Sequence, residues 1–505
     1  MILKKKCLLD ACVLMAYLAI NAVMLLRHEP WSDEAAPWLI ARDTDLPTFF
    51  HILINNYDRH PCLWYILLRP FASLGLPYLS QFILHLALAF TAVIIFVAKA
   101  PFSRLTKYLW VFSYFMMYEY ALVARPYGLT VALIFGLAAL YPRRFQHPWF
   151  YAILVFLAFN ASYLAFTFGL GLILFYGWEL WRAKKPMGAP WFALVTMILG
   201  ALLAFRQGGM LPPDHVNYDV QLPTHYEKAL DSISKAFIPF TIDVSSELAT
   251  VIALVIVAAT AFSFIRKPIP LALLLMSYAM PLYVFVFIHQ GDIRHYGFFL
   301  VFLLFALWIS GEYPELPAGG RLGKYLQRIN TGNCRKISLG LVTFCLLISL
   351  RATWHAQVME YRQLFSGAKE MASLVNKIFD QNNLDRQGYV LVAYSHTGTL
   401  SLLPYMPERK FWFPYLKSFA TYYLNKKTIW AEERMTHDDV IRETVAAFGD
   451  LSRVLFLFSR EPIQLNENHG YQFKQVAAVY ENVFGYTYER FFLYKPIPAA
   501  SAAIS

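Results

Sequence analysis

Long runs of apolar residues recur along most of this chain, and short polar segments separate them. A helix needs about 20 apolar residues to cross the hydrocarbon core of a bilayer, and most of these runs approach that length. The pattern therefore predicts eleven membrane-spanning helices. They lie near residues 8–26, 79–98, 107–123, 127–141, 149–161, 163–181, 190–206, 247–265, 269–288, 296–311 and 336–351.

A further apolar stretch, residues 61–76, differs from these runs. Arg69 interrupts it, and Pro61, Pro70 and Pro77 punctuate it. Because a charge and several prolines disfavour a regular membrane-spanning helix, we expect this stretch to form a helix that lies on the membrane surface.

The composition also indicates an integral membrane protein with the lipid bilayer as a partner. Of the 505 residues, 58% are hydrophobic and 15% are charged, whereas soluble proteins average about 25% charged residues. Too few polar residues remain to cover the surface of a large soluble enzyme. The net charge of +11 does not indicate nucleic-acid binding, because the basic residues lie between apolar runs and not on one soluble face.

The distribution of charge predicts the orientation of the spans. If the basic N-terminus is cytoplasmic, the segments on its side hold 18 basic and 4 acidic residues, and the opposite side up to residue 351 holds 10 basic and 14 acidic residues. Cytoplasmic segments of membrane proteins are enriched in Lys and Arg, so the N-terminus is expected in the cytoplasm. Residues 1–26 also have the order of a signal peptide, but their long apolar part and the lack of a clear cleavage site favour a retained helix.

The character of the chain changes near residue 352. Residues 1–351 form the predicted membrane domain, with a first outer loop at 27–78, and residues 352–505 hold 16 basic and 15 acidic residues and no spanning run. Alternating helix and strand patterns there predict a C-terminal extracytoplasmic α/β domain, and we find no nucleotide-binding glycine motif in it. The expected helices lie at 356–380 and 436–447, and the expected strands at 389–394, 453–459, 473–479 and 488–494.

The most informative polar stretch follows the first span. Asp33 and Glu34 are adjacent in it, and adjacent residues of a helix point about 100° apart, so the two carboxylates cannot act together on one face. At the start of a helix, one carboxylate can instead point into a cavity while the other braces the backbone. Ser32 or Asp33 could equally be an ordinary N-terminal cap. The residues alone leave both interpretations open.

Other polar residues lie at the predicted outer ends of spans. Asp58 and His60 precede the surface helix, and Glu119, Arg125 and Tyr127 lie near the end of another span. Charges near membrane depth need a partner or a water-filled cavity, which favours a functional role for these residues. In the alternative interpretation, His60 is a turn residue and Arg125 extends to the interface or pairs with Glu119.

A short outer turn between two late spans is also rich in hydrogen-bonding side chains. It contains His289, Asp292, Arg294 and His295. A guanidinium group suits a bidentate contact with phosphate, and a histidine can add to it. The alternative is an ordinary polar turn.

Four motifs follow one another on the predicted outer side, and they carry a resemblance to a known family. Their order and common sidedness resemble the GT-C superfamily of membrane glycosyltransferases, in particular the bacterial proteins grouped with protein O-mannosyltransferases and the lipid A aminoarabinose transferase. The resemblance implies a GT-C-like, mainly α-helical membrane fold in a bacterial inner membrane. The motifs are Trp31–Ala35 (WSDEA), Trp38–Asp43 (WLIARD), His60–Tyr65 (HPCLWY) and Ala124–Leu129 (ARPYGL).

The resemblance also implies an activity. In this superfamily the first-loop aspartate, here Asp33, is the base of an inverting sugar transfer from a polyprenyl-phosphate donor, and we expect Glu34 to brace it or to contact the acceptor. Basic groups of late outer loops, here Arg294 and His295, would contact the donor phosphate. The acceptor hydroxyl would belong to a lipid-linked glycan, a cell-envelope polysaccharide, lipid A or a protein.

No cofactor is clearly indicated, and two other functional classes stay open. Residues 43–45 (DTD) have the spacing of a divalent-metal motif, but their place at the end of a helix makes metal binding the less favoured interpretation. A polytopic transporter or lipid flippase would place polar residues near mid-membrane and often shows two related halves. A non-catalytic lipid-binding scaffold would not need the Asp33 carboxylate.

The long outer segment 207–246, with an amphipathic stretch at 225–238, could close over the acceptor or pack against the C-terminal domain.

Overall fold

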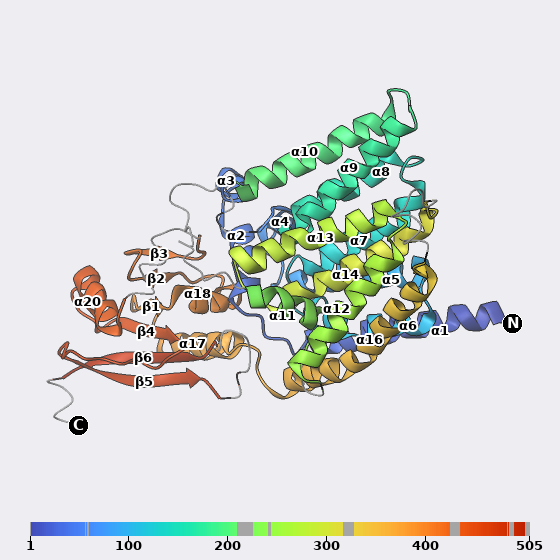
Figure 1. Cartoon of the computed structure of the whole chain (residues 1–505). Helices are drawn as coiled ribbons and strands as arrows, with labels where there is room; N and C mark the ends of the chain where they lie inside the picture. Colours follow the sequence, from blue (N-terminus) through green and yellow to red (C-terminus); the bar gives the residue numbers. More distant parts are fainter. Residues whose placement is uncertain are drawn as a thin grey trace.

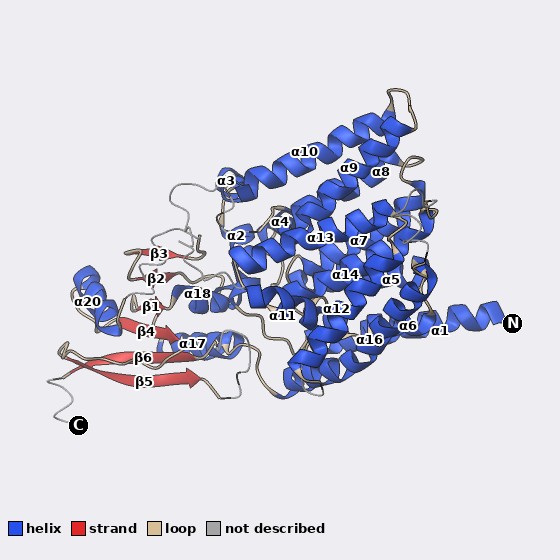
Figure 2. Ribbon diagram, in the orientation of Figure 1, coloured by secondary structure: helices blue, strands red, loops and turns tan. Residues whose placement is uncertain are grey.

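A large helical body and a smaller sheet-containing domain lie side by side in the computed structural model of the chain (Figure 1, Figure 2). The structure describes residues 2–55, 57, 60–209, 226–240, 244–316, 328–424, 435–481, 483 and 489–499. The first helix begins at the end of the helical body farthest from the sheet (Figure 1). If that helix spans a bilayer, its start and the sheet lie on opposite sides of the membrane.

The helical body is built from helices that follow one another with short connections. They are α1 (Ile2–Leu25), α2 (Ser32–Asp43), α3 (Leu46–Ile54), α4 (Leu63–Ser73), α5 (Leu79–Lys99), α6 (Arg104–Val111), η1 (Phe115–Glu119), α7 (Tyr127–Leu140), η2 (Tyr141–Arg143), α8 (Pro148–Ala161), η3 (Tyr163–Ala165), α9 (Phe166–Arg182), α10 (Ala189–Gly209), α11 (Tyr226–Phe237), α12 (Ser246–Ser263), α13 (Pro268–Phe287), α14 (Ile293–Ile309), η4 (Ser310–Glu312) and α16 (Thr331–Arg362).

Eight of these helices, within the described residues, are long and apolar enough to cross a bilayer. Each coincides with one of the predicted runs, so the structure confirms a mainly helical, multi-pass membrane protein. The eight are α1, α5, α9, α10, α12, α13, α14 and α16.

The predicted count of eleven spans is not confirmed. Two of the remaining runs form the shorter apolar helices α7 and α8, and the run at 107–123 is not one helix. There α6 ends at Val111 and the chain continues as the π-helical turn η1, whose residues are all buried. A segment that other helices enclose can make its backbone hydrogen bonds within the protein, so it need not be one regular spanning helix. Such a segment is as apolar as a true span, so hydropathy does not distinguish the two.

Several short helices cover the end of the helical body that faces the sheet (Figure 1). The stretch 61–76 forms the helix α4 as predicted, which packs against α2 and α8, and its place on the membrane surface stays a prediction. The amphipathic stretch predicted at 225–238 forms α11, which packs against α12, α13 and α14 of the body. The rest of the long outer segment, from 210 to 225 and from 241 to 243, lies outside the described residues.

The C-terminal domain contains one mixed sheet with strand order β3-β2-β1-β4-β6-β5, in which β1 is parallel to β2 and β4 and the other pairs are antiparallel. The structure confirms the strands predicted near 389–394, 453–459 and 473–479; the last predicted strand begins at Phe491. The domain comprises α17 (Ala368–Asn382), β1 (Val390–Tyr394), α18 (His396–Thr399), η5 (Leu400–Tyr405), β2 (Phe411–Phe413), β3 (Ser418–Ala420), α20 (His437–Phe448), β4 (Val454–Ser459), β5 (Tyr471–Val479) and β6 (Phe491–Pro498).

The last long helix of the helical body continues past residue 352, where the composition changes. The last long helix, α16, continues to Arg362, and a break at 363–367 separates it from α17. The prediction of one continuous helix over 356–380 is therefore wrong. The end of α16 and α17 have similar helical periodicity, so the sequence pattern does not reveal the break between them. The helix predicted at 436–447 is α20, capped by Thr436, whose hydroxyl accepts the N–H of Asp439 at 3.2 Å.

Both faces of the sheet are covered. Alternate strand residues point to opposite faces, so Phe456 and Phe458 pack with α20 on one face, while Leu455 and Leu457 pack with α17 on the other. The apolar cluster that contains Leu455 and Leu457 also includes Ala35 of α2, a helix that the sequence assigns to the membrane domain. The two parts of the chain therefore share a core.

Candidate active site

The start of α2 places Asp33 and Glu34 in different surroundings. Trp31 occupies the N-cap position, so neither Ser32 nor Asp33 holds the capping position that the sequence allowed. The side chain of Asp33 is one-third exposed (33%), whereas that of Glu34 is fully buried. The two adjacent carboxylates thus point to different places, as their 100° separation on a helix requires.

Two arginines from distant segments lie beside Asp33. The Nη2 atom of Arg294 is 3.3 Å from Asp33 Oδ2, and the guanidinium of Arg125 donates a hydrogen bond to the Asp33 backbone carbonyl. Arg294 also lies over the ring of Trp31, with Cζ 4.9 Å from the ring centroid. An aromatic face favours a cation over it, so Trp31 helps to hold the guanidinium near the carboxylate.

The turn before α14 positions Arg294. Gly291 adopts a positive φ of 71°, a conformation that other residues disfavour, and helix α14 begins two residues later. Asp292 then accepts a second hydrogen bond from the same Arg294 Nη2, at 2.9 Å. One nitrogen of Arg294 is therefore shared by two carboxylates, and the bond to Asp33 is the longer of the two.

His295 is held as a neutral ring. Its Nδ1 atom accepts the backbone N–H of Asp292 at 2.8 Å, so this nitrogen carries no proton. Its Nε2 atom then carries the proton and donates to the Tyr127 hydroxyl at 2.8 Å. The histidine fixes the turn and Tyr127, and it adds no positive charge to the predicted phosphate contact.

His60 completes the connected set, because its Nε2 atom accepts a hydrogen bond from Nη2 of Arg125. We call this set the Asp33 cluster. It contains two carboxylates and two guanidinium groups, so its charges balance. Its members, all expected from the sequence to form the site, are Asp33, His60, Arg125, Tyr127, Asp292, Arg294 and His295.

The remaining predicted residues lie elsewhere. Glu119 is buried in η1 and accepts the Tyr114 hydroxyl at 2.5 Å. His289 is exposed, and its Nδ1 atom accepts the backbone N–H of Gly291. Asp58 lies outside the described residues.

Both oxygens of Glu34 are engaged in hydrogen bonds. Oε1 accepts the backbone N–H of Ala124 at 2.6 Å, and Oε2 accepts the backbone N–H of Trp31 at 3.3 Å. His28 Nε2 lies between them, 3.1 Å from Oε2. A fully buried carboxylate with these partners braces the start of α2, which favours the bracing role over contact with an acceptor.

The partner on the other side of His28 could not be predicted from the sequence. Its Nδ1 atom is 2.8 Å from Oε1 of Glu360 in α16, and the Tyr118 hydroxyl donates to Oε2 of Glu360 at 2.7 Å. Burial alone would lower the pKa of His28, but Glu34 and Glu360 together raise it to about 10. A protonated His28 therefore joins α2 to the last long helix.

A metal site is not favoured at the DTD motif. Both oxygens of Asp43 accept hydrogen bonds from Arg42, at 2.6 and 2.9 Å. Asp45 instead caps α3, where its Oδ1 accepts the backbone N–H of Thr48 at 2.8 Å. The two carboxylates end one helix and start the next, so each has its own structural role.

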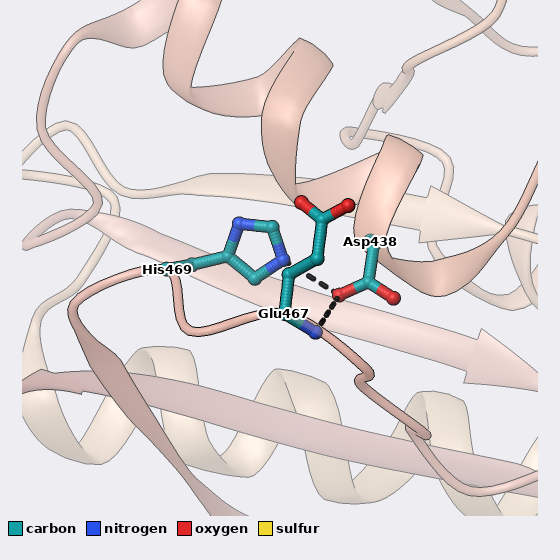
Figure 3. Close-up of side chains that lie close together, drawn as sticks. All are labelled: Asp438, Glu467 and His469. Carbon is teal, nitrogen blue, oxygen red and sulfur yellow. Dashed lines mark hydrogen bonds and ion pairs between the residues drawn. The ribbon is translucent and has the colours of Figure 1, made fainter.

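A second group of possible metal ligands lies in the C-terminal domain, where Asp438, Glu467 and His469 come together (Figure 3). Asp438 already accepts hydrogen bonds from His469 at 2.7 Å and from the backbone N–H groups of Asn466 and Glu467. These hydrogen bonds lower the pKa of Asp438 to about 2, and Glu467 is paired with Arg442. The arrangement binds the 464–469 loop to α20 without needing an ion.

Comparisons with known proteins found no match. No protein-family model, no curated protein and no solved structure matches the chain. The functional conclusion therefore depends on the Asp33 cluster and on the residues that surround it.

Proposed function

We propose that this chain is a membrane glycosyltransferase of the GT-C type, which moves a sugar from a polyprenyl-phosphate donor to an acceptor hydroxyl. One observation carries the proposal: the partly exposed Asp33 carboxylate pairs with Arg294, and Arg125 donates to the backbone carbonyl of the same residue, at the end of the helical body that faces the sheet (Figure 1). A donor with a lipid tail in the bilayer and a charged phosphate at its surface fits that position.

The proposed step needs one base and positive charge, and it needs no general acid. The acceptor oxygen attacks the anomeric carbon of the donor while its proton passes to the Asp33 carboxylate. The bond between the anomeric carbon and the phosphate oxygen breaks, and the lipid phosphate leaves with the electron pair. Attack from the side opposite the leaving group inverts the configuration of the sugar.

The arginines are suited to the departing phosphate. Arg294 presents one nitrogen, Nη2, to the carboxylates of both Asp33 and Asp292. We expect an arriving phosphate to take over part of this interaction, because guanidinium groups bind phosphate in a bidentate manner. The same exchange would release Asp33, whose 3.3 Å contact is the longer one, to act as the base.

The cellular setting is part of the proposal. The N-terminus would lie in the cytoplasm of a bacterial cell and the C-terminal domain outside the inner membrane, as the charge distribution predicts. A lipid-linked glycan, a cell-envelope polysaccharide, lipid A or a protein would supply the acceptor hydroxyl.

The test uses the purified full-length protein in nanodiscs, with radiolabelled polyprenyl-phosphate sugars and a membrane extract as the source of acceptors. Wild type is compared with Asp33→Asn and with the matched control Asp45→Asn. Asparagine caps a helix about as well as aspartate, so the control makes the same chemical change outside the cluster.

We expect Asp33→Asn to lower sugar transfer by at least about a hundredfold while donor binding is retained, because the base is lost and the shape is kept. Asp45→Asn should behave like wild type. Transfer that survives Asp33→Asn would exclude Asp33 as the base. If no lipid-phosphate sugar binds to the wild type, a transporter or a lipid-binding scaffold becomes the better proposal.

A further inference from the structure

Helix α2, which carries Asp33, is contacted along its length by the C-terminal domain. Ala35 and Leu39 are fully buried in the apolar cluster on one face of the sheet. Near the end of the helix, Arg42 Nη1 donates a hydrogen bond to the backbone carbonyl of Leu403 at 3.1 Å. The C-terminal domain therefore contributes to the position of this helix, although it lies more than 300 residues away in the sequence.

The first turn of α2 receives a carboxylate from the same domain. Glu489 is buried, with 1% of the residue exposed, and its Oε1 atom accepts the backbone N–H of Ser32 at 2.9 Å. Its Oε2 atom accepts the Ser366 hydroxyl at 2.6 Å, and its backbone carbonyl accepts the N–H of Gly367 at 3.1 Å. Glu489 is thus fixed at three points and directed at the residue that precedes Asp33.

This contact fills a need of the helix. The first N–H groups of a helix have no partner within it, and Trp31 at the N-cap position makes no side-chain capping bond. Glu489 supplies such a partner from a distant part of the chain.

We propose that Glu489 is a positioning residue for the Asp33 cluster, so that the C-terminal domain is a working part of the site. The inference builds on the proposed glycosyl transfer. Glu489 touches neither donor nor acceptor: it fixes the backbone at Ser32, and Arg125 fixes it at the carbonyl of Asp33. Together these two contacts set the direction in which the Asp33 carboxylate points.

The test compares two substitutions of nearly the same size in the full-length protein. In Glu489→Gln, the amide oxygen still accepts the Ser32 N–H, and the amide nitrogen can donate to the Ser366 hydroxyl. In Glu489→Leu, both hydrogen bonds are lost. The matched control is Glu461→Leu, which makes the same change at an exposed position of the same domain.

Two readouts are measured, and only one depends on activity. We expect Glu489→Leu to lower kcat at least about tenfold with little change in KM for the donor, because small displacements of a reacting group are costly. Amide hydrogen exchange at residues 32–35 should also become at least about tenfold faster, since the helix start has lost a partner. Glu489→Gln and Glu461→Leu should resemble wild type in both measurements.

Unchanged exchange at residues 32–35 in Glu489→Leu would overturn the proposal, and so would equal losses of kcat in Glu489→Leu and Glu489→Gln. If the wild type transfers no sugar, the proposed function fails by itself. The exchange measurement then still decides whether Glu489 positions the start of α2.

Discussion

Two clusters of arginine, carboxylate and tyrosine lie at opposite ends of α14, and they use these groups differently. At the start of the helix, Arg294 offers one nitrogen to two carboxylates, at 3.3 and 2.9 Å. Beyond its end, Arg144 makes a bidentate pair with Glu179, at 2.8 and 2.7 Å from Nη2 and 3.1 Å from Nε. We call the first arrangement open because one donor atom is shared by two carboxylates, and the second closed because two nitrogens of the arginine pair with one carboxylate.

The closed arrangement, which we call the Arg144 cluster, is complete without a ligand. Nη1 of Arg144 donates to the carbonyl of Tyr141 at 2.7 Å, and the Tyr313 hydroxyl donates to Glu179 at 2.8 Å. The Arg144 guanidinium also stacks over the Tyr141 ring at 4.1 Å. This ion pair holds α9 and the ends of α7 and α14 together. Its two nitrogens pair with the same carboxylate, so no donor atom is shared between two carboxylates.

This difference is the criterion by which we propose a site among the charged residues that a membrane protein encloses. Residue types do not distinguish the two clusters, because both contain an arginine, carboxylate and tyrosine. The number of donor atoms that are shared or loosely bound does distinguish them. A shared donor can be transferred to a ligand at small cost, whereas a bidentate buried pair loses several kcal/mol when it is opened, of the order of 3–5.

The largest effect is expected from Arg294→Gln. It should lower kcat/KM for the donor by about a hundredfold to a thousandfold, the usual range when a charge-stabilising donor is removed from a reacting site. The measurement is sugar transfer in nanodiscs over a range of donor concentrations. An activity within about threefold of wild type would remove Arg294 from the proposed phosphate contact.

The opposite profile is expected for Glu179→Gln in the Arg144 cluster. It should lower the free energy of unfolding by about 3 kcal/mol, because the neutral amide leaves the buried charge of Arg144 without its carboxylate. Sugar transfer per folded molecule should stay at the wild-type level. Unfolding curves and transfer are measured on the same preparation, and a selective loss of transfer would show that the comparison between the clusters is wrong.

The next prediction concerns His28, whose two ring nitrogens are paired with Glu34 and Glu360. Its folded pKa of about 10 lies above the unfolded value of 6.5, so its contribution to stability is complete below pH 6.5 and declines until it is lost above about pH 10. We expect the melting temperature of the wild type to fall as the pH rises through this range. His28→Gln should start lower and show a flatter curve; parallel curves would contradict the protonated state of His28.

The smallest effect is expected from Asp45→Asn, which tests the DTD motif together with Asp43→Asn. Asp45→Asn should change the free energy of unfolding by less than about 0.5 kcal/mol, because Asp45 is an exposed helix cap and asparagine caps about as well. Asp43→Asn should lower it by about 2 kcal/mol, because the largely buried bidentate pair of Asp43 with Arg42 is weakened. Sugar transfer should not respond to chelation of divalent metals in these variants or in wild type. A loss of transfer on chelation that Mg²⁺ or Mn²⁺ restores would bring the metal interpretation back.

Much of the candidate site could be predicted from the sequence because of topology. Asp33 follows the first span, and Arg125 and Arg294 each lie beside the start of a later apolar helix, on one predicted side of the membrane. Alternating spans bring such segments to the same side, so residues from three distant motifs were expected to meet. The structure brings them into one hydrogen-bonded set.

The partners of these residues could not be predicted, because they depend on packing between elements far apart in the chain. His28 and Glu360 are 332 residues apart, and Ser32 and Glu489 are 457 residues apart. The span predicted at 107–123 failed for a related reason. Hydropathy measures how apolar a segment is, and it does not tell whether lipid or other helices surround it.

The shared core of α2 and the sheet has a consequence for biosynthesis. Ala35 and Leu39 leave the ribosome early, but β4 and β6, which form part of their apolar surroundings, are made more than 400 residues later. At about 10 residues per second this interval lasts on the order of 40 seconds. During that time the exposed face of α2 needs a temporary partner, such as the bilayer surface or a chaperone. A chain that stops before residue 489 would insert its helices and still lack the final contact at Ser32.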